Sequence, residues 1–112
     1  MAIVVSTSDP SGFLQSIRTA IDEHRILTWS YDSDGDFTYA VAQWENRAWL
    51  RPETARSSIT FSIVGPQNVG VSSDAYAIYH SRFIEMLLLY LDSGFETAQA
   101  TALATSADDV DG

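Results

Sequence analysis

Apolar residues recur along the chain at two different spacings, which separate predicted helices from predicted strands. Over residues 8–25, apolar side chains follow at three- and four-residue steps, as they do on one face of an α-helix. Ser8 or Asp9 can act as the N-cap, and Pro10 suits the first turn. The pattern predicts an N-terminal helix that lies on a sheet through one apolar stripe: Phe13, Leu14, Ile17, Ala20 and Ile21.

Apolar and polar residues then alternate in four short runs, which is typical of strands with one buried face. Leu27, Trp29 and Tyr31 are expected to share one face of the first strand, and Phe37 and Tyr39 one face of the second. Short polar connections make the first three runs a meander of hairpins. The runs are "ILTWSY", "FTYAVAQW", "AWLR" and "ITFSIV", with a further short strand possible at residues 3–5.

A second helix is predicted from Ser72 or Ser73, which can act as its N-cap, to about residue 92, with Gly94 as the breaker. The fold class is therefore α+β with two layers. An N-terminal and a C-terminal helix pack on an antiparallel meander of about four strands. No linker or repeat divides the chain, so residues 1–106 are expected to form a single domain.

The net charge of the chain limits the kinds of molecule that it is expected to bind. Fifteen acidic residues stand against six basic ones, all arginine, for a net charge of -9. This field repels phosphate backbones and anionic lipids, so neither nucleic acid nor a membrane surface is expected as a partner. The lysine-free composition fits either a halophilic, high-salt cytoplasm or a genome that favours arginine codons. The segment after the second helix consists of residues with small or polar side chains and is expected to fray from the helix. Residues 107–112 are predicted to be a disordered acidic tail.

The absence of cysteine excludes disulfide scaffolds, thiolate zinc sites and cysteine nucleophiles. The first residues carry no signal-peptide pattern, and the longest apolar run, residues 86–91, is too short to span a membrane. We therefore expect a soluble, cytoplasmic protein. No phosphate loop, nucleophile elbow or dinucleotide-binding glycine pattern occurs, so no cofactor is expected and nothing argues for an enzyme.

Asp32, Asp34 and Asp36 surround one glycine between two strand-like runs. Counted from Asp32, these carboxylates match the first three ligand positions of a calcium-binding EF-hand loop. The sixth and twelfth positions are Phe37 and Gln43, which fail the pattern. The cluster is therefore predicted to be a hairpin turn rather than a specific metal site, with loose binding of a divalent ion by its three carboxylates as the alternative. Together with Trp44, the three aspartates are candidates for binding a protein partner.

His80 falls within the apolar arc of the second helix, where it must find a hydrogen-bond partner or lose its charge. Two interpretations stay open. His80 is either a core histidine bonded to a strand, or part of a pocket between helix and sheet that binds a small ligand or supports weak enzymatic activity. Trp29 and Tyr39 would line that pocket with Arg51 at its edge. No second histidine is spaced for zinc.

The second helix carries more apolar surface than a small sheet can cover. Ile78, Leu88 and Leu89 fall outside the arc that faces the sheet. Burial of such side chains stabilises by about 1.5–3 kcal/mol each, so a homodimer through this helix is predicted. The alternative is that the first helix or the tail covers the excess. The leading hypothesis is a non-enzymatic interaction or regulatory module whose acidic surface binds a basic protein partner.

Overall fold

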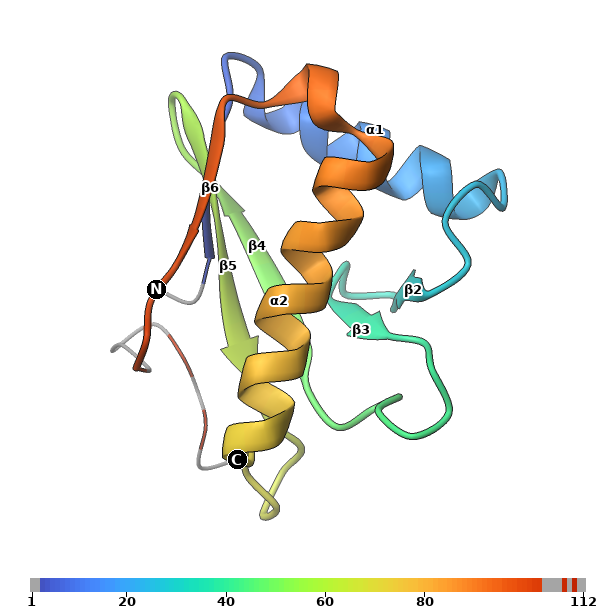
Figure 1. Cartoon of the computed structure of the whole chain (residues 1–112), viewed down its shortest axis with the longest axis vertical. Helices are drawn as coiled ribbons and strands as arrows, with labels where there is room; N and C mark the ends of the chain where they lie inside the picture. Colours follow the sequence, from blue (N-terminus) through green and yellow to red (C-terminus); the bar gives the residue numbers. More distant parts are fainter. Residues whose placement is uncertain (1–2, 104–107, 109, 111–112) are drawn as a thin grey trace.

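Six strands form an open antiparallel sheet with two α-helices in the computed structural model of the chain (Figure 1). The structure describes residues 3–103, 108 and 110. The helices are α1 (Pro10–Asp22) and α2 (Ser73–Tyr90), and α2 is followed by a short 3-10 turn, η1 (Asp92–Gly94). The strands are β1 (Ile3–Ser6), β2 (Trp29–Tyr31), β3 (Phe37–Tyr39), β4 (Trp49–Thr54), β5 (Ser58–Val64) and β6 (Thr97–Ala100).

The order of strands across the sheet is β2-β3-β4-β5-β1-β6, and every neighbouring pair is antiparallel. The α+β class is confirmed, and β2 to β5 form the predicted meander. The expectation of about four strands is wrong, because β1 and β6 extend the sheet beyond β5. β6 has the sequence "TAQA", without the apolar alternation that marks a strand. It is a strand because it pairs with β1, with Val4 opposite Gln99 and Ser6 opposite Thr97.

The second predicted strand is shorter in the structure than its sequence pattern. β3 ends at Tyr39, because the backbone N–H groups of Trp44 and Glu45 both donate to the Val41 carbonyl, each at 2.8 Å. These bonds form a helical turn in place of a strand. Leu27 also departs from the prediction, since it precedes β2 and is 73% exposed instead of sharing the buried face of Trp29.

Both helices begin as the sequence predicts. The Asp9 side chain accepts a hydrogen bond from the Gly12 N–H at 3.2 Å, and the Ser72 hydroxyl accepts one from the Ala75 N–H at 3.1 Å. Each cap satisfies one of the N–H groups that the first turn of a helix leaves without a partner. α2 ends at Tyr90, and Gly94 lies in η1 just beyond it.

An aromatic cluster joins α2 to the sheet. The Phe83 ring of α2 lies 4.7 Å from the Phe61 ring, 5.0 Å from Trp29 and 5.8 Å from Phe37, measured between centroids. In Figure 1, α2 crosses in front of β4 and β5. The alternation predicted for β5 is confirmed by its fully buried residues, and α1 adds its apolar stripe to the same core: Ile59, Phe61 and Ile63 with Phe13, Leu14, Ile17 and Ala20.

The predicted acidic tail falls largely outside the described residues, so its disorder stays a prediction. Within it, the Asp108 carboxylate accepts a hydrogen bond from the Ile63 N–H at 2.9 Å. The Val110 carbonyl accepts one from the Val71 N–H at 2.7 Å. Neither helix of the described part has the length and hydropathy needed to cross a membrane.

Candidate functional site

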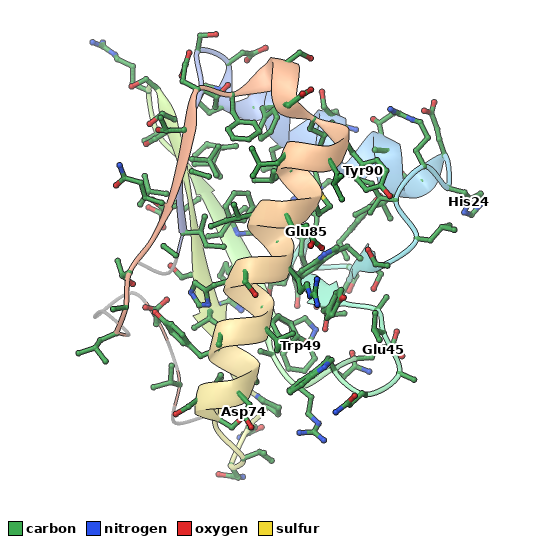
Figure 2. The ribbon with its side chains drawn as sticks, viewed as in Figure 1. His24, Glu45, Trp49, Asp74, Glu85 and Tyr90 are labelled. Atoms are coloured by element: carbon green, nitrogen blue, oxygen red, sulfur yellow. The ribbon has the colours of Figure 1, made fainter. Side chains whose placement is uncertain are left out.

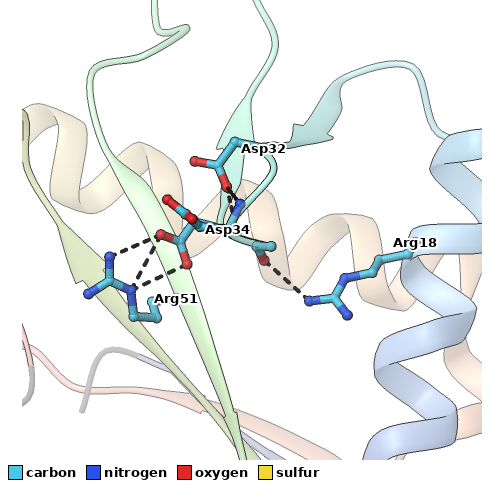
Figure 3. A network of polar contacts seen from close by, with 6 residues as sticks. Arg18, Asp32, Asp34 and Arg51 are labelled. Atoms are coloured by element: carbon cyan, nitrogen blue, oxygen red, sulfur yellow. Dashed lines mark hydrogen bonds and ion pairs between the residues drawn. The ribbon is translucent and has the colours of Figure 1, made fainter.

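The aspartate cluster forms a closed turn between β2 and β3 (Figure 3). One carboxylate oxygen of Asp32 accepts hydrogen bonds from the N–H groups of Asp34 and Asp36, both at 3.0 Å. The Gly35 N–H donates to the Asp32 carbonyl at 3.0 Å, and Gly35 has a φ of 86°, which glycine adopts without strain. The residues therefore adopt the turn that the sequence predicts, with Asp32 as its internal acceptor.

Asp36 does not face solvent. Its side chain is buried, and the Arg51 guanidinium binds it through Nη2 at 3.1 Å and through Nε at 3.3 and 3.4 Å. These hydrogen bonds and the charge of Asp36 raise the pKa of Arg51, and the charges of Asp34 and Asp32 raise it further. Asp32 and Asp34 are thus the exposed carboxylates of the predicted partner-binding set, while Asp36 holds Arg51 in place.

A shallow acidic hollow of about 340 Å³ lies beside this turn. Trp49 lines the same hollow as the aspartates, which sequence analysis did not connect with it. The strand period gives only part of this link, because Trp49 and Arg51 are two residues apart and so share a face of β4, whereas the approach of Arg51 to Asp36 is a long-range contact. An aromatic ring with exposed carboxylates suits a cationic side chain. The lining residues are Asp32, Asp34, Asp36, Trp49, Arg51, Val64, Gly65, Pro66 and Gln67.

Arg18 of α1 reaches the same turn from the other side (Figure 3). Its Nη2 donates to the Gly35 carbonyl at 3.4 Å, and its guanidinium carbon lies 5.8 Å from the ring centroids of both Tyr31 and Phe37. The Tyr31 hydroxyl donates to Asp22 at 2.7 Å, and this bond raises the pKa of Tyr31. Sequence analysis missed these links, which fix the turn to α1.

His80 is 4% exposed and packs within its own helix. Its Nδ1 lies 2.5 Å from the Tyr76 carbonyl, which can only accept, so Nδ1 carries the proton. The two rings stack with centroids 3.9 Å apart. Nε2 is buried without a hydrogen-bond partner among the described residues. Desolvation lowers the pKa of His80, although the Tyr76 carbonyl and the charge of Asp108 partly oppose this effect.

The four residues proposed for a ligand pocket do not converge on one cavity. Trp29 is buried in the aromatic cluster, and the Tyr39 ring packs against it at 5.1 Å. Neither they nor His80 lines any of five surface hollows bordered by described residues. Arg51 instead lines the acidic hollow.

Trp44 lies apart from the aspartate turn. It follows the C-terminal end of β3, whereas the aspartates precede the N-terminal end of that strand. Its ring is half-buried against the core, and the Arg47 guanidinium lies 5.9 Å from the ring centroid. The predicted partner-binding residues therefore form two separate surfaces.

The C-terminal half of α2 exposes consecutive apolar side chains. Leu88 and Leu89 are 56% and 68% exposed, and Ile78 is half-buried three turns earlier. Between these positions, Arg82 pairs with Glu85 at 3.0 Å. Figure 2 shows α2 in front of the strands with Glu85 along it. The predicted interface residues thus lie around an internally neutralised ion pair, a surface that we call the α2 outer face.

Comparisons with known proteins give no functional lead. No protein-family model, curated protein or solved structure matches this chain. Among residues 3–103, 108 and 110, no three histidine, aspartate or glutamate side chains are grouped so as to hold a metal ion. The acidic hollow and the α2 outer face are therefore the candidate functional surfaces.

Proposed function

We propose that this chain is a non-enzymatic protein-interaction module that acts as a homodimer. In this proposal the domain has two layers, with α1 and α2 packed on one face of the sheet. The α2 outer face then receives the same surface of a second copy. The exposure of Leu88 and Leu89 carries the proposal, because full burial of a leucine stabilises by about 1.5–3 kcal/mol and more than half of each side chain is still in water.

The charge of the α2 outer face favours a second copy as its partner. The chain has a net charge of -9, yet between Ile78 and Leu89 this face carries one arginine and one glutamate, which pair with each other, while Asp74 and Asp92 lie beyond its two ends. Two copies of the face can therefore approach without direct repulsion between like charges. A twofold contact uses the same surface on both subunits and is the commonest form of homo-oligomer.

The acidic hollow supports a second contact, with a basic segment of another protein. Asp32 and Asp34 are exposed there, and the Trp49 ring offers a surface for an arginine or lysine side chain. Because Asp36 already neutralises Arg51, the two exposed carboxylates leave the hollow negative. Such a contact is weakened by salt, since exposed charges are screened.

Light scattering coupled to size exclusion at micromolar concentration tests the dimer. We expect the wild-type chain to have the mass of a dimer, and the double variant Leu88→Glu with Leu89→Glu to have half that mass. The control adds the same two charges to the exposed side of α1, as Gln15→Glu with Ser16→Glu, and is expected to remain a dimer. A wild-type monomer, or a leucine double variant of unchanged mass, would show that the α2 outer face is not the interface.

A further inference from the structure

The two edges of the sheet are built differently. β2 forms one edge with only three residues, and Tyr31 at its end is tied to Asp22. β6 forms the other edge, and no strand in the described part of the chain lies on its outer side. Short strands and charged neighbours protect an edge from pairing with another chain. β2 is short and is followed by the acidic turn at residues 32–36. β6 is only one residue longer, and what distinguishes it is the uncharged run that follows it.

The register shows which backbone groups of β6 are free to pair. The Thr7 N–H donates to the Ser57 carbonyl at 3.1 Å, so the odd-numbered residues of β1 direct their backbone groups toward β5. Val4 and Ser6 therefore direct theirs toward β6, where they face Gln99 and Thr97. It follows that the N–H and carbonyl groups of residues 98 and 100 point away from the sheet.

The side chains near this edge offer no electrostatic obstacle to pairing. Residues 97–103 carry no charge and include no proline, in a chain whose net charge is -9. Natural edge strands often carry lysine, proline or a bulge that blocks a second strand. β6 has neither lysine nor proline, and Thr97, Gln99 and Ala100 are exposed. The ladder is irregular only just before the strand, where the Glu96 N–H donates to the carbonyl of Ser6, whose register partner is Thr97.

We propose that β6 pairs in antiparallel fashion with β6 of a second copy, about a twofold axis at Gln99. Ala98 of each copy then lies opposite Ala100 of the other, so all the outward backbone groups of the strand pair. Glu96 lies opposite Ala102, so no two carboxylates meet. A register centred on Ala98 would require Glu96 to pair outward, but its N–H already donates to the Ser6 carbonyl at 2.8 Å. A register centred on Ala100 would require Ala102, which lies beyond the strand.

This contact is separate from the α2 outer face. It rests on backbone pairing between small side chains, so we expect it to be weaker and to join dimers only at higher protein concentration. A protein with two different twofold surfaces forms a closed tetramer when the two axes intersect at right angles and an open filament when they do not intersect. Failure of the α2 interface would leave β6 pairing intact, and the reverse also holds.

Disulfide trapping tests the proposed register directly, since the chain contains no cysteine. Gln99 faces its own copy as a non-hydrogen-bonded pair, with Cα atoms about 4.5 Å apart, a separation that a disulfide spans. The Gln99→Cys variant is made in the Leu88→Glu, Leu89→Glu background and oxidised with glutathione disulfide. We expect covalent dimers to form on the order of tenfold faster than in the matched Gln67→Cys control, an exposed loop position, because pairing concentrates the thiols.

A second variant separates pairing from chance collision. Ala100→Pro removes an N–H that points outward, so the ladder with β1 is kept while pairing with a second copy is lost. Added to Gln99→Cys, it should reduce trapping to the rate of the Gln67→Cys control with an unchanged circular dichroism spectrum. Equal trapping rates for the cysteine variants at residues 99 and 67, or fast trapping that survives Ala100→Pro, would overturn the proposal.

Discussion

The two helices bury their apolar surface to different extents. α1 buries one stripe and exposes polar residues such as Gln15 and Ser16 on its other side. α2 buries a longer row that includes Tyr79 and Phe83, and still exposes Leu88 and Leu89. Packing within the chain accounts for the pattern of α1. α2 carries more apolar surface than its own sheet covers, and we propose that a second copy of the chain covers the rest.

The largest expected effect lies in the part of α2 that does pack on the sheet. Phe83→Ala removes a fully buried ring that contacts three other rings, and we expect it to lower the free energy of unfolding by about 3–5 kcal/mol. Phe13→Ala in α1 should cost less, because among the described residues Phe13 has one ring neighbour, Phe95, at 5.5 Å. Urea unfolding followed by circular dichroism measures both changes.

Equal losses for these two variants would mean that α1 and α2 anchor the core alike. The contrast drawn between the helices would then concern their surfaces alone. A larger loss of unfolding free energy for Phe13→Ala than for Phe83→Ala would contradict the expectation that the aromatic cluster contributes most to stability.

Local patterns in the sequence predicted the helices and the central strands. The caps at Asp9 and Ser72 and the alternation in β5 depend on neighbours within a few residues, so they can be recognised from the sequence. β6 could not, because its small side chains carry no period and only its pairing with β1 makes it a strand. The caps and β5 therefore depend on residues close in sequence, whereas β6 depends on a contact between residues far apart in sequence.

The contacts of the candidate site also divide into local ones, which the sequence predicts, and long-range ones, which it does not. The aspartate turn was predictable, since the Asp32 side chain bonds N–H groups two and four residues away. The ion pair of Asp36 with Arg51 joins residues fifteen positions apart, and no spacing rule predicts it. Trp29 and Tyr39 were expected to line a pocket, but they pack against each other because the aromatic cluster fills that space.

Burial of His80 in α2 should make the stability of the chain depend on pH. Burial lowers the pKa of His80 in the folded chain, whereas the unfolded chain takes up a proton near pH 6.5. As the pH falls from about 7.5 to about 5.5, the unfolded state binds more protons and the free energy of unfolding decreases, by at most about 1.4 kcal/mol per pH unit for this one group. The His80→Gln variant should lose that part of the pH dependence.

His24→Gln is the matched control, because His24 is exposed in the turn after α1. Chemical unfolding at several pH values in this window measures the slope for each variant. A slope that His80→Gln leaves unchanged would show that protonation of His80 does not oppose folding.

The smallest effects concern the two caps. Ser72→Ala removes one hydrogen bond and should cost about 1 kcal/mol, because Asp74 in the first turn of α2 still interacts favourably with the helix dipole. α1 has no acidic residue in its first turn, so Asp9→Ala removes both the cap and the negative charge and should cost more. Asp9→Asn keeps an acceptor without the charge and should fall between Asp9→Ala and the wild type. If Asp9→Asn is as unstable as Asp9→Ala, the charge alone stabilises the start of α1; if it matches the wild type, the hydrogen bond alone does so.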